Sequence, residues 1–254
     1  MTRRLTVDLL PALHPEGLEG GTALVIDVLR ATTTATTFLE CGAAGVVFAP
    51  SREAALAQRG RGAAEVLLAG ERGGLRLDGF DLGNSPLEAA ASPCQGRRAV
   101  MNTSNGTDAA HVASAHAEQV MLACLRNAGA AARAAQASSG HVTIVCAGTD
   151  RQIGLDDAYT AGVLVRELLV LDEWLLNDSA QLALALLERW PAPLDALQAS
   201  SHGQRLLGLG DVNEAAEVLA RDVLFCAEAG VSDCVPALSA RGEGGGLLFT
   251  LLER

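Results

Sequence analysis

A carboxylate, a guanidinium and two hydroxyls follow an apolar run near the start of the chain. The run Ala23–Asp27 ends in the Asp27 carboxylate, and Arg30, Thr32 and Thr33 come just after it. The apolar run predicts a buried strand, and the Thr-rich segment predicts the first turn of a helix. A strand that delivers a carboxylate beside a helix N-terminus can hold a metal ion and an oxyanion side by side. This segment is the first candidate for an active site.

Two glycine-rich segments further along the chain also carry acidic and polar side chains. Glu71 and Arg72 lie in the segment Gly70–Gly74, directly after a predicted strand. Glycines there allow backbone N–H groups to approach an anion closely. The next segment, Gly79–Pro86, precedes a helix that is predicted to have Pro86 in its first turn. It adds three polar candidates, Asp81, Asn84 and Ser85.

A third polar segment, residues 102–107, repeats the order of strand, polar turn and helix start. Hydroxyls, Asn side chains and the unpaired N–H groups of a first helical turn can form a neutral cradle for an anion. The candidate ligands in this cradle are Thr103, Asn105, Gly106 and Thr107. The alternative is that these residues only cap the helix.

Two adjacent carboxylates, Asp156 and Asp157, begin a later predicted helix after the strand-ending segment Cys146–Thr149. Acidic residues at a helix start could simply complement the helix dipole. They could also complete a site for a hard cation together with Asp27 and Glu71, because Mg²⁺ takes oxygen ligands and retains several waters.

Familiar hydrolase templates do not fit the chain. A cysteine-based phosphatase needs Cys and Arg six positions apart, and Cys146 and Arg151 are one residue too close. An aspartyl-phosphate enzyme of the haloacid-dehalogenase type needs a second Asp where this chain has Leu29. The sequence also has no Arg-His-Gly triplet for a phosphohistidine mechanism and no GxSxG serine elbow. Its five histidines have no metal-ligand spacing, so we expect them on the surface or in structural contacts.

The composition excludes several classes of function. The chain has no Lys among its 19 basic residues, which excludes Schiff-base chemistry and a P-loop lysine. Its net charge of −11, without basic runs, argues against nucleic acid as a partner. Local cations must therefore attract any small anionic substrate. Neither a signal-length apolar region nor a membrane-spanning run is present, and the six scattered cysteines read as reduced, so we expect a cytoplasmic protein without membrane contact.

Short apolar runs alternate with helical patterns over the first 155 residues. The predicted strands cover residues 5–10, 23–27, 45–48, 65–69, 97–101, 119–124 and 141–146. The predicted helices cover 32–41, 51–59, a segment from 86, 107–117 and 127–138. This alternation predicts an α/β fold, a three-layer α/β/α arrangement with a mainly parallel or mixed central sheet. Ligands bind such sheets at the carboxyl ends of the strands, where the polar segments lie.

The sequence pattern changes after Leu155. Longer helical patterns cover 157–172 and 179–190, and shorter ones continue to 219, so we expect a helical C-terminal extension of one domain over residues 1–254. Two apolar runs, Val223–Ala227 and Gly246–Leu252, could return to the sheet or pair as an edge hairpin. The apolar helices of the extension could also contribute to a homodimer interface.

Six ordered motifs together resemble the 2-phosphosulfolactate phosphatase family, also called ComB. They are VIDVLRATTT (25–34), GER (70–72), GFDLGNSPLE (79–88), TSNGT (103–107), CAGT (146–149) and LDDAYTAG (155–162). The tail segments 201–209 and VSDCVP (231–236) fit the C-terminal part of the family. The chain departs from the family's pattern at Asp156, where Glu is usual.

The resemblance implies a Mg²⁺-dependent phosphatase that converts 2-phospho-3-sulfolactate into 3-sulfolactate and phosphate. In this reading Asp27, Arg30, Glu71 and Asp81 are catalytic, and the metal ligands come from Asp27, Glu71, Asp156 and Asp157. The substrate-binding set is Arg30, Thr32, Thr33, Arg72, Asn84, Ser85, Thr103, Asn105, Gly106 and Thr107. The alternatives are a phosphatase for another small anionic ester, such as phospholactate, and a non-catalytic anion-binding protein.

Overall fold

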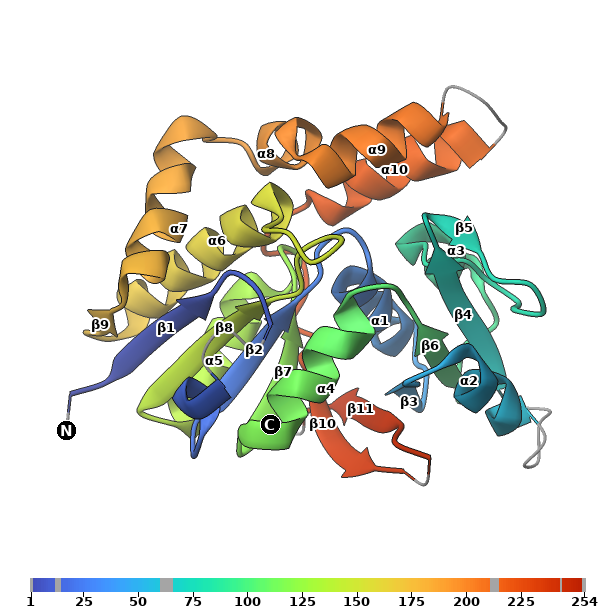
Figure 1. Cartoon of the computed structure of the whole chain (residues 1–254), viewed down its shortest axis with the longest axis horizontal. Coiled ribbons are helices and arrows are strands. Elements are labelled where there is room, and N and C mark those ends of the chain that lie inside the picture. Colours follow the sequence, from blue (N-terminus) through green and yellow to red (C-terminus); the bar gives the residue numbers. More distant parts are fainter. Residues whose placement is uncertain (1, 12–14, 60–65, 211–214, 243, 253–254) are drawn as a thin grey trace.

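Two blocks of parallel strands, joined by an antiparallel hairpin, form the sheet of this chain (Figure 1). The computed structural model describes residues 2–11, 15–59, 66–210, 215–242 and 244–252. One block contains β4 (Val66–Arg72), β6 (Arg98–Asn102) and β3 (Gly45–Phe48). The other contains β7 (Gln119–Ala123), β2 (Thr22–Ile26), β8 (His141–Cys146) and β1 (Arg4–Asp8).

The hairpin of β10 (Pro236–Arg241) and β11 (Leu247–Leu251) lies inside the sheet, between β7 and β3. The short strands β5 (Leu75–Arg76) and β9 (Leu175–Leu176) close the two edges. The sheet is therefore mixed and mostly parallel, as the sequence predicts. The apolar run at 246–252 does form a strand, but in the interior of the sheet and not in an edge hairpin.

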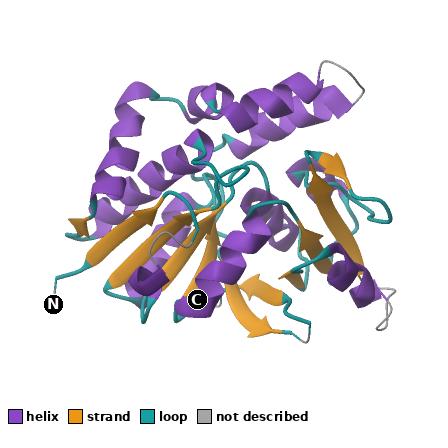
Figure 2. Ribbon diagram, viewed as in Figure 1, coloured by secondary structure: helices purple, strands orange, loops and turns teal. Residues whose placement is uncertain are grey.

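Helices cover both faces of the sheet (Figure 2). The first five are α1 (Ala31–Glu40), α2 (Arg52–Arg59), α3 (Pro86–Ala91), α4 (Gly106–His116) and α5 (Ala128–Ser138), and a 3₁₀ turn covers Pro15–Leu18. The C-terminal extension contains α6 (Leu155–Leu171), α7 (Asp178–Arg189), α8 (Pro193–Ala199), α9 (Ser201–Gly210) and α10 (Ala215–Cys226). In Figure 1, α8, α9 and α10 run above the upper ends of the strands.

The central strand β2 shows why the fold has three layers. All five of its residues are buried. Leu24 and Ile26 pack into one core with α5 and α6, whereas Ala23 and Val25 pack into a second core with α1 and α4. Successive side chains of a strand point to opposite faces, so a strand that is apolar throughout must be covered on both sides.

Helix α1 is buried from Ala31 to Leu39 although five of these nine residues are Thr. The hydroxyls of Thr36 and Thr37 donate to the carbonyl oxygens of Thr32 and Thr33, one turn earlier, at 2.8 and 2.9 Å. These bonds satisfy the hydroxyls without water. The Thr-rich segment can therefore form a central helix in contact with the sheet.

One predicted strand is wrong, and three strands in the structure were not predicted. The run Val223–Ala227 is no strand; residues up to Cys226 belong to α10. Its buried residues, Val223 and Cys226, are three positions apart, which is helical spacing. Strands β5, β9 and β10 were not predicted, and the predicted residue Glu65 lies outside the described residues. All six cysteines are free thiols, and within the described segments no helix is long and apolar enough to cross a membrane.

Candidate active site

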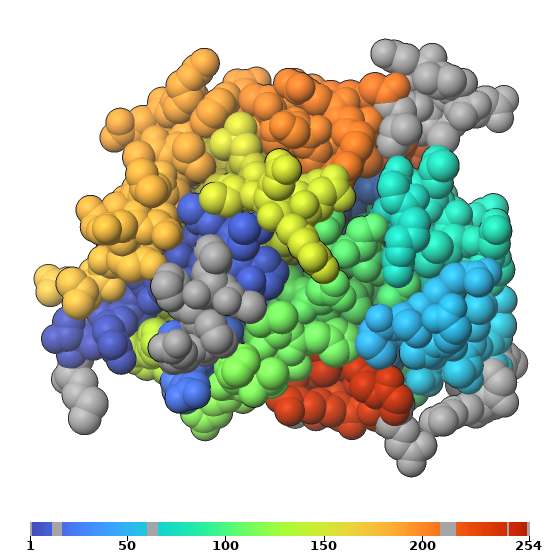
Figure 3. Space-filling model, viewed as in Figure 1, coloured from blue at the N-terminus to red at the C-terminus, as the bar shows by residue number. Residues whose placement is uncertain are grey.

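The loops after β2, β4, β6 and β8 meet under helix α9 and enclose a narrow polar pocket of about 50 Å³. In Figure 3 the surface is hollowed between the yellow segment near residue 150 and the turquoise segment near residue 73. The predicted site residues that line the pocket are Asp27, Arg30, Glu71, Asn84 and Asn105. A larger cavity of about 650 Å³, between α5 and Leu252, contains none of the predicted site residues.

Asp27 stands directly after β2 and is only 6 % exposed. Its Oδ1 accepts the N–H of Ala31, at the start of α1, at 3.2 Å. Burial raises the pKa of Asp27 from 3.8 to about 6; the nearby His202 lowers it, and Glu71 and Asp156 raise it further. The other oxygen, Oδ2, lies against Gly106, where an added Cβ would come within 2.7 Å of it. Only glycine at the start of α4 leaves room for this carboxylate.

Arg30 and Ser85 both bond to the carboxylate of Asp222, so three distant segments of the chain meet there. Its Nη1 donates to Oδ2 of Asp222, on α10, at 2.6 Å, and the hydroxyl of Ser85 donates to Oδ1 of Asp222 at 2.7 Å. Asp222 is fully buried and Arg30 is 4 % exposed. Burial raises the pKa of Asp222, and Arg30 and Ser85 act in the opposite direction. The guanidinium therefore has a fixed position in the wall of the pocket.

The Glu71 carboxylate joins two of the loops. Its Oε1 accepts the N–H and the hydroxyl of Ser104 at 2.9 and 3.0 Å, and its Oε2 accepts the N–H of Gly74 at 2.9 Å. Charge-assisted bonds of this kind are stronger than those between neutral groups. Glu71 thus holds the loop after β6 against the hairpin after β4.

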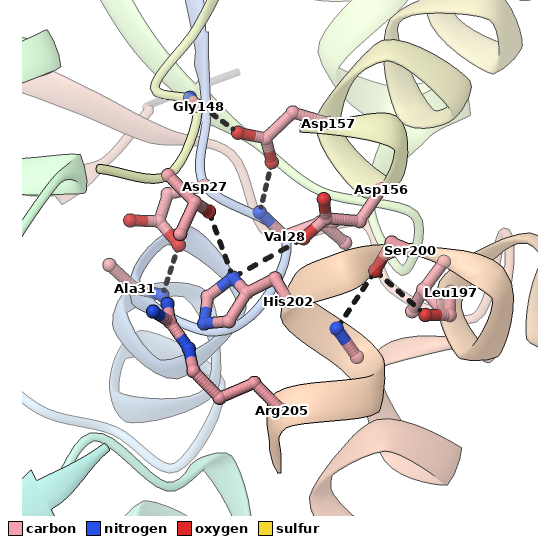
Figure 4. Close-up of polar contacts among 12 residues, drawn as sticks. Asp27, Val28, Ala31, Gly148, Asp156, Asp157, Leu197, Ser200, His202 and Arg205 are labelled. Atoms are coloured by element: carbon pink, nitrogen blue, oxygen red, sulfur yellow. Dashed lines mark hydrogen bonds and ion pairs between the residues drawn. The ribbon is translucent and has the colours of Figure 1, made fainter. Parts of the chain in front are cut away.

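The two adjacent carboxylates at the start of α6 differ in their contacts (Figure 4). Asp157 accepts the N–H of Val28 and the N–H of Gly148, both at 2.9 Å, and so ties the end of β2 to the end of β8. Burial, Asp156 and Asp27 raise the pKa of Asp157 well above its usual value. Asp156 faces His202 instead, with 3.4 Å between its Oδ2 and the ring Nδ1.

Helix α9 contributes two side chains that sequence reasoning missed, His202 and Arg205. Figure 4 shows both side chains directed from α9 toward Asp27. Residues three positions apart share one face of a helix, so their spacing was the available signal. Thr149 Oγ1 lies 3.2 Å from Nδ1 of His202, and Nη1 of Arg205 lies 2.8 Å from Oδ2 of Asp150. Asp222 was also missed, because nothing in the sequence connects it with Arg30.

The threonines predicted to bind substrate are used within the fold. The hydroxyls of Thr32 and Thr33 donate to the carbonyl oxygens of Asp27 and Val28, both at 2.9 Å, and neither lines the pocket. The hydroxyls of Thr103 and Thr107 lie 3.1 Å apart and shape the turn before α4. Ser85 caps α3 and donates its hydroxyl to Asp222.

Asp81 and Arg72 do not line the pocket either. Asp81 accepts the N–H of Leu68 at 2.9 Å and forms an ion pair with Arg59. Arg72 donates to the side-chain oxygen of Asn102 at 2.5 Å. Both side chains therefore have partners that hold the surrounding loops.

The oxygen donors of the pocket suit a hard cation. Among the described residues, no three His, Cys, Asp or Glu side chains are grouped closely enough to hold a metal ion by themselves. However, two buried oxygens have no hydrogen-bond partner among the described residues. One is Oδ1 of Asn84, which lines the pocket, and the other is Oδ1 of Asp156, which lies behind the pocket residue His202. Mg²⁺ commonly uses one or two carboxylates, waters and substrate oxygens. The donor set fits such an ion.

Comparison with known proteins connects this geometry to a family. The sequence profile described as 2-phosphosulpholactate phosphatase matches residues 8–241. A Deinococcus radiodurans protein described as a probable 2-phosphosulfolactate phosphatase is 49% identical over 236 residues, 92% of this chain and 93% of that protein.

Two further relatives carry the same description. A Thermus thermophilus protein is 46% identical over 247 residues, 97% of this chain and 98% of its own length. A Gloeobacter violaceus protein is 37% identical over 235 residues, 91% of this chain and 94% of its own length. The loops that form the pocket all fall within the matched region, and the chain belongs to the 2-phosphosulfolactate phosphatase family.

Proposed function

We propose that this chain hydrolyses 2-phospho-3-sulfolactate to 3-sulfolactate and phosphate in the pocket between Asp27 and α9, and that the reaction requires Mg²⁺. The observation that carries the proposal is the position of Asp27, a buried carboxylate that shares a narrow pocket with the fixed guanidinium of Arg30. The descriptions of the relatives support the same substrate.

The pocket contains two guanidinium groups, Arg30 and Arg205, in an acidic protein. The substrate has a phosphate, a sulfonate and a carboxylate, and the net charge of the chain, −11, would repel it. Arg30, Arg205 and the positive ends of the helix dipoles of α1 and α4, which begin at Ala31 and Gly106, offset part of this repulsion. A volume of about 50 Å³ suits one phosphoryl group, so the rest of the substrate extends toward the pocket mouth.

Asp27 and Asp156 would hold Mg²⁺, and Asn84 could add an amide oxygen. When bound, the ion neutralises charge on the phosphoryl oxygens, which matters because uncatalysed phosphate-monoester hydrolysis needs acceleration of up to ~10²¹-fold. Glu71 and Asp157 keep the loops in place through their bonds to backbone N–H groups. Arg30 binds and orients the phosphoryl group, since Asp222 and Ser85 prevent its guanidinium from turning away.

Phosphate release from 2-phospho-3-sulfolactate and from 2-phospholactate, each with Mg²⁺ and with EDTA, tests this function. We expect release from the sulfonate ester with Mg²⁺ and loss of release in EDTA. Release that persists in EDTA would refute the metal requirement. A preference for phospholactate would change the assigned substrate to an ester without a sulfonate. The absence of release from any ester would favour an anion-binding protein.

A further inference from the structure

The two arginines of the pocket have counter-ions of very different accessibility. The side chains of Arg30 and Asp222 are 4% and 0% exposed, so their ion pair is sealed inside the protein. The side chains of Arg205 and Asp150 are 41% and 70% exposed. Ion pairs in contact with water contribute little stability, because solvent screens the charges and both side chains must be ordered. A bound anion can therefore displace Asp150 from Arg205 much more readily than it can displace Asp222 from Arg30.

Arg205 stands where the narrow pocket opens into a wider space. It lines the pocket of about 50 Å³ and also an adjoining cavity of about 400 Å³ between the loop after β8 and α9. His202 and Asp150 line both spaces as well. A substrate that places its phosphoryl group near Asp27 and Arg30 would have its other anionic groups in this region.

A second cavity, of about 700 Å³, adjoins the pocket on the side of the loop after β6 and contains Arg151. Arg151 does not line the narrow pocket, whereas Arg205 does. Among the described arginines that line the two adjoining cavities, Arg205 is therefore the one that can contact a substrate already bound at Asp27.

We propose that Arg205 recognises the sulfonate of the substrate and that Asp150 is an exchangeable counter-ion, which occupies Arg205 until the sulfonate replaces it. This inference rests on the proposed function, because it assigns a part of the same substrate to a residue. In the free protein, Nη1 of Arg205 donates to Asp150 at 2.8 Å. In the complex the same N–H donates to a sulfonate oxygen, and the Asp150 carboxylate turns to water. A guanidinium presents its donors in a rigid fork that matches oxyanions, which Lys cannot reproduce.

The matched substrates 2-phospho-3-sulfolactate and 2-phospholactate differ only in the sulfonate, and steady-state kinetics with both test the proposal. We expect Arg205→Gln to raise KM for the sulfonate ester about 10-fold to 100-fold, as for a lost charge-assisted hydrogen bond, with less than about 3-fold change for phospholactate. Arg205→Lys should recover only part of the loss. An equal effect on both substrates would overturn the assignment.

Asp150→Asn provides the opposite test. Asp150 has a φ of 54°, a left-handed conformation that Asn also tolerates, so this variant removes the charge without new backbone strain. We expect a lower KM for the sulfonate ester and little change for phospholactate. A higher KM for the sulfonate ester would contradict an exchangeable counter-ion.

Two further measurements separate this inference from the proposed function. Arg151→Gln, in the second cavity, should leave both KM values unchanged. A KM that rises only for the sulfonate ester in this variant would assign sulfonate recognition to Arg151 and overturn the role of Arg205. Calorimetric binding of 3-sulfolactate and of lactate does not depend on turnover. If the wild-type protein hydrolyses no ester but binds 3-sulfolactate, and Arg205→Gln loses that binding, the phosphatase is refuted and the sulfonate site is supported. If Arg205→Gln binds 3-sulfolactate as tightly as the wild-type protein does, the sulfonate site is overturned.

Discussion

Arg30 and Asp222 are 192 positions apart in the chain, yet they form a buried ion pair with 2.6 Å between Nη1 and Oδ2. Arg30 follows β2 and lines the pocket, and Asp222 belongs to the last helix of the extension. The C-terminal helices therefore do more than cover the sheet: one of them fixes a guanidinium of the candidate active site.

Removal of Asp222 should affect both stability and activity. Asp222→Asn leaves the guanidinium of Arg30 buried without its counter-ion, so we expect a loss of about 3–5 kcal/mol in the free energy of unfolding. Phosphate release should also fall, because Arg30 can leave its position. Denaturant unfolding and initial rates measure the two effects.

The double variant Arg30→Met, Asp222→Leu tells the two roles apart. Replacing both charges with apolar side chains should restore most of the stability, because no buried charge remains unpaired. Activity should stay low, since the phosphoryl group loses its guanidinium. A stable and fully active double variant would show that Arg30 has only a structural role.

Asp27→Asn should abolish turnover and stabilise the metal-free protein at neutral pH. The pKa of Asp27 is about 6 when folded and 3.8 in the reference state, so the folded state binds more protons between these values. Stability that depends on this group must then fall as the pH rises through that range. Because Asn never carries the charge, its advantage should approach about 3 kcal/mol above pH 7 and fall below about 1 kcal/mol near pH 4.

Unfolding of the wild-type protein and of Asp27→Asn in guanidinium chloride, with EDTA present and at several pH values between about 4 and 8, measures this difference in stability. A difference in stability that does not vary with pH would show that the pKa of Asp27 is not raised by burial. A variant that retains turnover would remove Asp27 from the reaction altogether.

Glu71→Gln should loosen the pocket through the backbone. A Gln amide can accept from Ser104 or from Gly74 with its one oxygen, but its NH₂ group then faces an N–H donor on the other side. We expect a loss of about 1–3 kcal/mol in stability and a lower kcat. Ser104→Ala, which removes only the hydroxyl, should cost less. An unchanged Mg²⁺ concentration for half-maximal activity in Glu71→Gln would support a positioning role, and a much higher one would restore Glu71 as a metal ligand.

Gly106→Ala tests how closely α4 approaches Asp27. The new Cβ would lie 2.7 Å from both Oδ2 of Asp27 and Cβ of Ala31, so one of these groups must move. We expect overpacking to cost about 1–3 kcal/mol, together with a severe loss of activity. Gly140→Ala is the matched control, since a Cβ there meets no atom within 4 Å. Wild-type activity in Gly106→Ala would show that Asp27 can shift without consequence.

The order of elements and the general position of the site could be predicted from the sequence. Apolar runs such as 23–27 are buried on both faces, and a buried strand must be apolar regardless of its partners. Asp27, Arg30, Glu71 and Asn105 were predicted because each was expected just after a strand, and the carboxyl ends of parallel strands lie along one edge of their sheet. Asn84 was predicted from the polar turn before a helix, and Glu71 proves to lie near the end of β4 itself. Pairing across the sheet was not predictable: the apolar pattern of β11 does not reveal that it separates the two parallel blocks.

The role of each side chain was decided by tertiary structure. Asp156 and Asp157 are neighbours of the same type, yet one faces His202 and the other bonds to two loop N–H groups, because successive helical residues point about 100° apart. His202, Arg205 and Asp222 enter the site only because the extension folds back over the strand ends. Sequence patterns report local burial and turns, whereas a counter-ion 192 positions away becomes a neighbour only when the chain has folded.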